Sequence, residues 1–243
     1  MDGIVRCSRY AFGPNRLHYC GPDAAGEIRS YIGDNNSDPG LEMLLKAFRT
    51  MFPYLRYIAA ENNITDPFDE KVVEAYWIGN ELLENIEKKS FYRHLLEDHK
   101  IQDKVGKKSF ELIAEKIIGG ALPHHSFHVI DIWKRTGHLE REHTLESMDS
   151  CRISWGRIME IDGPAITVSY EPLIFEGHKL ALGPAISKKI ARNLETEIDI
   201  DNLKIGDTVS IHWDIPCEVI TEKQAGALRG LTMRHIALAN QTL

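Results

Sequence analysis

The stretch CRISWGRIMEIDG, residues 151–163, decides the fold of this 243-residue chain. It is rich in strand-forming residues and it closes on a turn signal, Asp162-Gly163-Pro164. Three more short β-rich runs follow, with turn residues between them: AITVSYEP (165–172), ETEIDI (195–200) and DTVSIHWDIPCEVI (207–220). Several short strands within about 70 residues are typical of a small closed barrel. The sequence therefore predicts an OB-like β-barrel whose first strand carries Cys151.

The chain beyond the last of these runs has a different character. TEKQAGALRGLTMRHIALANQ (221–241) begins with Thr221 and has Gln224 three residues later, which is the pattern of a capping box. We therefore expect the barrel to be followed by a C-terminal helix.

The sequence before residue 146 predicts helices rather than strands. Apolar residues recur at helical spacing in four segments: 40–62, 66–89, 107–120 and 123–137. Pro53 lies inside the first segment and is expected to kink or split it, because proline removes a backbone donor. Asp66 is expected to cap the second segment, and Gly119-Gly120 to end the third.

These patterns together predict an α+β protein with two domains. A mainly helical domain over 1–147 would be followed by the β-barrel domain with its C-terminal helix over 148–243. Residues 1–39, rich in Gly, Pro and Asn, are expected to be mostly irregular, and LESMDS (145–150) has the polar, small residues of a linker.

Composition narrows the classes of function. The net charge is −7, and the barrel half shows no excess of basic residues, so neither a nucleic acid nor an anionic membrane surface is the expected partner. No apolar run approaches the roughly 20 residues that span a bilayer. The N-terminus lacks the apolar core of a signal peptide. We therefore expect a cytoplasmic protein.

The four cysteines are too far apart for a CxxC metal motif: Cys7, Cys20, Cys151 and Cys217. In a reducing cytoplasm they are not expected to form a disulfide framework. Each can be a small buried hydrophobic residue, and this is the ordinary interpretation for Cys217 in the middle of a predicted strand.

Several residues of the barrel half match the order and spacing of one known family. They are Cys151, Gly156, the turn Ile161-Asp162-Gly163, the strand Gly206-Asp207-Thr208-Val209-Ser210-Ile211-His212, and then Ile220, Glu222 and Ala225. On these residues the segment 151–230 resembles the HypC/HupF family, small β-barrel chaperones that help to assemble the iron centre of [NiFe] hydrogenases. The whole chain also looks like a prokaryotic family of unknown function.

The resemblance implies a chemistry for two residues. In that family the cysteine thiolate helps to hold iron that carries cyanide and CO, together with a partner scaffold protein, and the strand histidine lies near it. Carried over, this makes Cys151 and His212 the iron-handling pair. Because Cys151 is internal here, we expect it to face a cleft between the two halves, lined on the far side by Cys20 or by residues 124–128.

Two further groups in the helical half are candidates for chemistry. In PHHSFH (123–128), His124 and His128 are four residues apart and share a helix face, the spacing of chelating pairs, with His125 beside them. Upstream, Cys20 before Gly21-Pro22 and next to His18 is a candidate activated thiol. The histidines can equally be exposed or bonded to backbone carbonyls, and Cys20 can be packing in a tight loop.

The sequence leaves three functions open. The first is a [NiFe]-hydrogenase maturation factor that handles iron or its diatomic ligands during assembly of the Fe(CN)2CO centre, with maturation scaffold proteins or the hydrogenase large subunit as partners. The second is a metal- or thiol-dependent enzyme that makes or transfers a small ligand precursor, with the helical domain as catalytic unit. The third, an OB-like nucleic-acid binder, is disfavoured by the absence of a basic surface.

Overall fold

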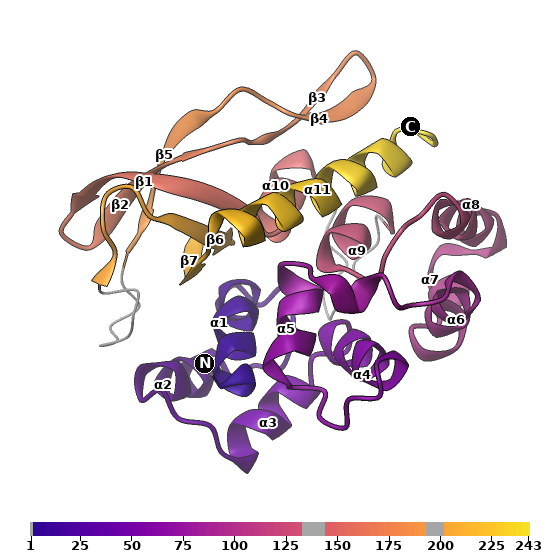
Figure 1. Cartoon of the computed structure of the whole chain (residues 1–243), viewed down its shortest axis with the longest axis horizontal. Coiled ribbons are helices and arrows are strands. Elements are labelled where there is room, and N and C mark those ends of the chain that lie inside the picture. Colours follow the sequence, from indigo (N-terminus) through magenta and orange to yellow (C-terminus); the bar gives the residue numbers. More distant parts are fainter. Residues whose placement is uncertain (1, 133–143, 193–201) are drawn as a thin grey trace.

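The computed structural model describes residues 2–132, 144–192 and 202–243 and confirms the α+β class, with a helical region before the strands. Figure 1 shows the sheet on one side of the molecule and the first helices on the other, with the last helix, α11, running between them. The bounds of the helical elements are α1 (Gly3–Arg16), α2 (Ala25–Gly33), α3 (Pro39–Lys46), α4 (Met51–Glu61), α5 (Glu70–Trp77), η1 (Glu81–Leu83), α6 (Lys88–Arg93), η2 (His94–Asp98), α7 (Ile101–Val105), α8 (Lys107–Ile118), α9 (His125–Asp131), α10 (Leu145–Cys151) and α11 (Glu222–Ala239).

The N-terminal residues are helical, and the prediction of an irregular segment over 1–39 was wrong. The side chain of Asp2 caps α1 by accepting from the backbone nitrogens of Ile4 and Val5. Nearly every residue of α1 is buried, including Arg6 and Arg9. Gly3, Gly13 and Pro14 all lie in this helix, and such weak helix formers give the segment the composition of a loop.

The helices predicted over 40–62 and 66–89 both exist in pieces. The first breaks before α4, so that Pro53 falls in the first turn of α4, where a backbone N–H has no helical partner to lose. The second is interrupted after α5 at Gly79, whose φ of +98° leaves the helical region. Asp69, rather than Asp66, caps α5.

The segment 145–150 is also helical, and the prediction of a linker there was wrong. Thr144 accepts a hydrogen bond from the backbone nitrogen of Ser147 and so begins α10. The prediction that the first strand carries Cys151 was also wrong, because this helix extends through Cys151 and the first strand starts at Ser154. The predicted helices over 107–120 and 221–241, with the Thr221/Gln224 capping box, are confirmed.

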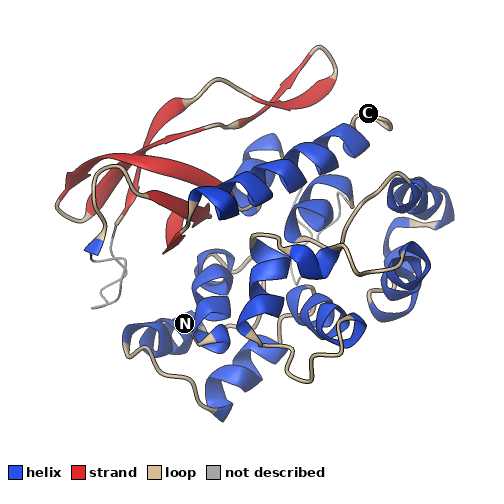
Figure 2. Ribbon diagram, viewed as in Figure 1, coloured by secondary structure: helices blue, strands red, loops and turns tan. Residues whose placement is uncertain are grey.

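The strands form one five-stranded antiparallel sheet and a separate hairpin (Figure 2). The bounds are β1 (Ser154–Asp162), β2 (Ala165–Tyr170), β3 (Leu173–Glu176), β4 (Lys179–Leu182), β5 (Ile186–Ala191), β6 (Thr208–His212) and β7 (Ile215–Val219). The order of the large sheet is β5-β2-β1-β6-β7, and β5 also approaches β7, so the sheet curls toward a barrel. The predicted strand over 195–200 lies outside the described residues.

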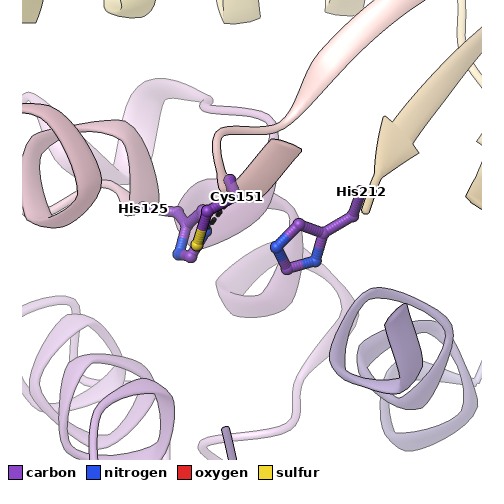
Figure 3. A group of neighbouring side chains, drawn as sticks. All are labelled: His125, Cys151 and His212. Atoms are coloured by element: carbon purple, nitrogen blue, oxygen red, sulfur yellow. Dashed lines mark hydrogen bonds between the residues drawn. The ribbon is translucent and has the colours of Figure 1, made fainter. Parts of the chain in front are cut away.

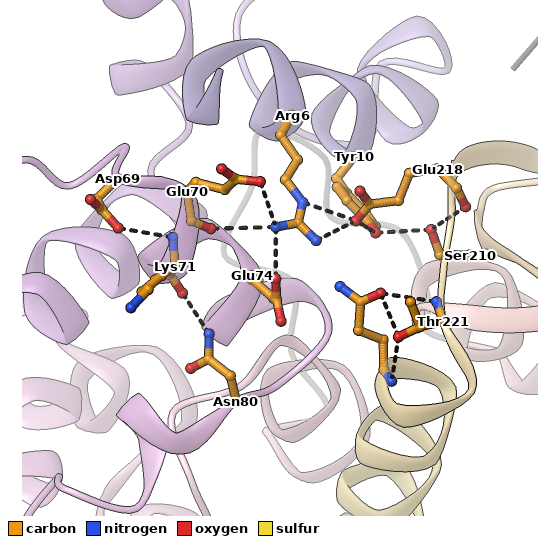
Figure 4. A network of polar contacts seen from close by, with 11 residues as sticks. Arg6, Tyr10, Asp69, Glu70, Lys71, Glu74, Asn80, Ser210, Glu218 and Thr221 are labelled. Carbon is orange, nitrogen blue, oxygen red and sulfur yellow. Dashed lines mark hydrogen bonds and ion pairs between the residues drawn. The ribbon is translucent and has the colours of Figure 1, made fainter. Parts of the chain in front are cut away.

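The largest apolar core crosses the boundary predicted at 147/148. Ile215 and Cys217 of β7 belong to the same cluster of buried side chains as Tyr10 of α1. A buried ion pair joins the same two elements: Arg6 Nη2 lies 2.8 Å from Glu218 Oε1 (Figure 4). Because the apolar core and this ion pair both cross the predicted boundary, they do not separate the chain into two domains, and that division stays a prediction. In the described part of the chain, no helix has the length and apolar character to cross a membrane.

Candidate metal centre

Three side chains with metal-binding groups converge where the helical region meets the sheet. His125 comes from the start of α9, Cys151 from the end of α10, and His212 from the end of β6. One ligand atom from each can be chosen so that all three lie within 4.8 Å of one another. In Figure 3 the ring of His212 points toward the other two side chains. The predicted closeness of Cys151 and His212 is confirmed.

A backbone contact explains why Cys151 and His212 are adjacent. The β6–β7 turn consists of Trp213 and Asp214, whose φ values are +52° and +61°. The backbone nitrogen of Trp213 donates to the carbonyl of Ser150 over 2.8 Å. Since each of these residues is a chain neighbour of a site residue, the bond brings the end of β6 against the end of α10.

The tautomer of His212 is fixed by one hydrogen bond. Its Nδ1 lies 2.6 Å from the carbonyl oxygen of Tyr10, which can only accept, so Nδ1 carries the proton. Nε2 therefore presents a buried lone pair that makes no hydrogen bond to the described residues, although the carbonyl of Cys151 lies near enough to this ring to favour its cation. A backbone carbonyl on one imidazole nitrogen and a free lone pair on the other is the usual arrangement of a metal-binding histidine.

The tautomer of His125 is fixed in the same way and with the opposite result. Its Nε2 lies 2.8 Å from the carbonyl oxygen of Cys151 and must donate to it. Nδ1 then has the lone pair and accepts from the hydroxyl of Tyr76 over 3.1 Å. Nδ1 is therefore the ligand atom that His125 can offer without breaking its bond to Cys151, and only the Tyr76 hydroxyl has to give way.

Both histidines are neutral at neutral pH, as metal ligation requires. Burial lowers the pKa of His212 to about 4, although the carbonyls of Tyr10 and Cys151 favour the cation. Burial, and then the nearby His212, lower the pKa of His125 well below its usual value. An incoming cation therefore meets two uncharged imidazoles and no competing proton.

The three residues line a small cavity of about 70 Å³. Most of its wall is aromatic or aliphatic, and its lining residues are Ala11, Pro14, Tyr19, Cys20, Phe48, Thr50, Met51, Tyr76, Trp77, His125, His128, Val129, Cys151, His212 and Trp213. Cys20 and part of the 124–128 segment thus line the same pocket as Cys151, and a cleft between two domains stays a prediction.

The three histidines of PHHSFH do not converge on one point. His124 caps α9 and bonds to Ser126, whose hydroxyl contacts His235. His128 lines the pocket, and its Nδ1 lies 3.3 Å from the hydroxyl of Tyr54. Only His125 belongs to the group around Cys151 in the described chain. The i, i+4 pairing of His124 and His128 is lost because α9 begins at His125, which leaves His124 outside the helix.

His18 takes no part in the pocket. Its side chain is exposed and its Nδ1 pairs with Asp23 at 3.2 Å. The predicted partnership of His18 with Cys20 therefore has no counterpart in the pocket lining, because His18 adopts φ +56° at the end of α1 and leaves the wall to Tyr19 and Cys20.

Sequence reasoning missed two residues of the site. Tyr10 supplies the carbonyl that orients His212, and it lies in a segment expected to be irregular. Tyr76 lies in the helix predicted over 66–89, and nothing in the sequence indicates its bond to His125. The turn at Trp213-Asp214 also lies within what was predicted as one β-rich run over 207–220, because this pair is not a residue combination typical of hairpin turns.

Comparison with known proteins identifies a family for this chain but gives no information about the chemistry of the site. A model described as a family of unknown function (DUF6390) matches residues 1–243. No curated protein and no solved structure matched the chain. Nothing in these comparisons connects it with the HypC/HupF family.

Proposed function

Because the chain belongs to this family of unknown function, we propose its function from the site alone: it binds a transition-metal ion through His125, Cys151 and His212. The finer proposal is that the ion is iron, handled with its diatomic ligands during assembly of a [NiFe]-hydrogenase centre. Its partners would then be a maturation scaffold protein or the hydrogenase large subunit.

One observation carries the metal proposal, the buried lone pair of His212 Nε2. An imidazole nitrogen that is buried without a partner costs about 1–3 kcal/mol of stability. Such an unpaired nitrogen is explained if its lone pair is kept available to bind a metal ion. The bond from Nδ1 to the Tyr10 carbonyl keeps it directed at Cys151 and His125.

The spacing of the donors supports a single ion. Metal–ligand distances of about 2.0–2.3 Å place the ligands of a tetrahedral ion roughly 3.5 Å apart. With one ring nitrogen chosen for each histidine, the donor atoms lie within 4.8 Å of one another, so for that choice a closure of about 1 Å suffices. Such a closure is in reach of side-chain rotation at Cys151, which ends a helix and is partly exposed.

Iron is favoured by the chemistry of the donors and the wall. One thiolate with two neutral imidazoles is a soft-to-borderline set that suits iron, zinc or copper and not magnesium or calcium. The remaining positions of the ion would face an apolar, aromatic wall, which accommodates small uncharged or weakly solvated ligands such as CO. The order of cysteine, histidine and C-terminal helix along the chain is that of the HypC/HupF resemblance.

Anaerobic purification followed by metal analysis and infrared spectroscopy tests both levels of the proposal. We expect one iron per chain, and stretching bands of CO or cyanide when the protein is made together with the hydrogenase maturation proteins. Cys151→Ala and His212→Ala should each reduce the affinity for Fe²⁺ by at least about 100-fold, more than the loss of an outer-shell partner.

His99→Gln is the matched control for these variants. His99 is also buried, and within the described structure neither ring nitrogen has a hydrogen-bond partner, but it lies outside the group. It should bind iron like the parent. Parent protein that takes up no metal under reducing conditions would contradict the metal site. Parent protein that binds iron but shows no CO or cyanide bands would support the metal site and contradict a role in assembly of the hydrogenase centre.

A further inference from the structure

The loop between α1 and α2 carries a second thiol to the same pocket. Cys20 and Cys151 both line the cavity, while Cys7 and Cys217 are fully buried and do not. Of the described cysteines, these two are therefore the ones whose side chains share a pocket with His125 and His212.

The loop that carries Cys20 is fixed by its own hydrogen bonds. Asn15 Nδ2 donates to the carbonyl of Cys20 over 2.8 Å and to that of Pro22 over 2.6 Å. Gly21 has φ +84°, and a Cβ there would meet the ring of Phe48 at 2.4 Å, so only glycine fits. These contacts set the path of the backbone on both sides of Cys20 and with it the direction of its side chain.

The loop is also attached to the strand that carries His212. The ring of Tyr19 stacks on that of Trp213 with centroids 4.2 Å apart and an interplanar angle of 20°. Tyr19 and Trp213 are the chain neighbours of Cys20 and His212. The stacking therefore fixes the backbone next to Cys20 relative to the backbone next to His212. The hydrogen bond between Ser150 and Trp213 does the same for Cys151 and His212.

A tetrahedral site needs four donors, and the group described above supplies three. Cys20 is not a member of that group, so its sulfur has to move toward the ion to complete the set. We propose that Cys20 is the fourth protein ligand and that metal binding turns its side chain toward the ion, while the 17–24 loop keeps the path that its contacts set. This inference rests on the metal site proposed above.

The chemistry of this step is ligation without oxidation. Each of the two thiols, Cys20 and Cys151, loses its proton to solvent as its sulfur–metal bond forms, and the ion keeps its charge state. The result is a donor set of two sulfurs and two nitrogens. Such a set holds zinc or ferrous iron tetrahedrally, and it leaves two further positions if iron becomes octahedral.

Cobalt titration of the reduced full-length protein tests this assignment, because thiolate-to-Co²⁺ charge transfer in the near ultraviolet grows with the number of bound thiolates. We expect Cys20→Ala and Cys151→Ala each to lower the intensity per bound Co²⁺ to about half, and Cys20→Ala to weaken binding by at least about 100-fold. Cys7→Ala is the matched control, a buried cysteine on α1 outside the pocket lining, and should keep the full intensity.

A second variant separates ligation from packing. Cys20→His restores a ligand without a thiolate, so it should recover much of the affinity while the charge-transfer intensity stays at about half. Parent-like intensity and affinity in Cys20→Ala would overturn the role of Cys20 and leave the three-residue site standing. A parent protein that binds no Co²⁺ would overturn the metal site itself, and the inference with it.

Discussion

The backbone nitrogen of Trp213 donates to the carbonyl oxygen of Ser150 over 2.8 Å. The two residues are 63 positions apart, and each is next to a candidate ligand, His212 in one case and Cys151 in the other. A site built in this way depends on main-chain geometry at the β6–β7 turn. Changes to this turn should therefore affect the site even where no ligand is touched.

Asp214 offers the cleanest test of that dependence. It adopts φ +61°, which a β-branched residue tolerates poorly, and its carboxylate pairs with Lys188 at the surface. Asp214→Val and Asp214→Asn both lose this pair, but asparagine accepts the left-handed conformation. We expect the valine variant to be less stable than the asparagine variant by about 1–2 kcal/mol in urea unfolding. Equal stabilities would mean that the turn is not held in this conformation.

The protonation pattern of the two imidazoles is a second expectation, and it needs no metal. Nitrogen-15 correlation spectra of the metal-free protein near pH 7 should show His212 as the Nδ1–H tautomer and His125 as the Nε2–H tautomer. The carbonyls of Tyr10 and Cys151 impose this difference. On addition of Zn²⁺ the unprotonated nitrogen of each ring should shift. A His212 ring protonated at Nε2 would remove the lone pair on which the site depends.

The sequence predicted the parts of this site that follow from local pattern. The β-rich run predicted over 207–220 covers both β6 and β7, and the resemblance to the HypC/HupF family implied that Cys151 and His212 would lie close together. The choice of His125 among the histidines of 124–128 could not be predicted, because it depends on where α9 begins. Tyr10 could not be predicted either, because Gly13 and Pro14 give the α1 segment the composition of a loop.

Acid should unfold the protein at a comparatively high pH. Burial lowers the pKa of six histidines: to about 4 in His94 and His212, to about 3 in His124, and in direction also for His99, His125 and His235. The folded state therefore binds fewer protons than the unfolded state below about pH 6.5. At pH 5 each of the first three costs about 2 kcal/mol of stability.

One buried acid acts in the other direction. Burial raises the pKa of Asp131 to about 7, against the attraction of Lys116, so its contribution to stability increases as the pH falls from 7 toward 4. The gain from this one carboxyl group is smaller than the combined cost of the six buried histidines. That cost is large compared with the total stability of a domain, about 5–15 kcal/mol. Circular dichroism between pH 7 and 4 should show unfolding that begins below pH 6.5. A native spectrum retained at pH 4 would contradict the burial of these rings.

The final expectation concerns whether the helical and β-rich halves unfold together. Arg6 on α1 donates through Nε and Nη2 to Glu218 Oε1 at 3.0 and 2.8 Å, and it also pairs with Glu74 at 2.9 Å. The hydroxyl of Tyr10 donates to the same Glu218 oxygen over 2.6 Å (Figure 4). Glu218 lies on β7, so three charged groups and a phenol connect the halves inside the protein. A common core of apolar side chains surrounds them.

Arg6→Met removes the cation and leaves Glu218 buried without its partner, which should cost about 3–5 kcal/mol. The double variant Arg6→Met with Glu218→Gln should recover part of this loss, because the amide still accepts from Tyr10 and no charge is left in the core. In urea, tryptophan fluorescence reports on both Trp77 of α5 and Trp155 of β1, while circular dichroism follows the helices. We expect one transition by both probes in the parent, since the shared core makes neither half stable alone. Two separated transitions, with Arg6→Met shifting only one of them, would establish the halves as independent domains joined near residue 148.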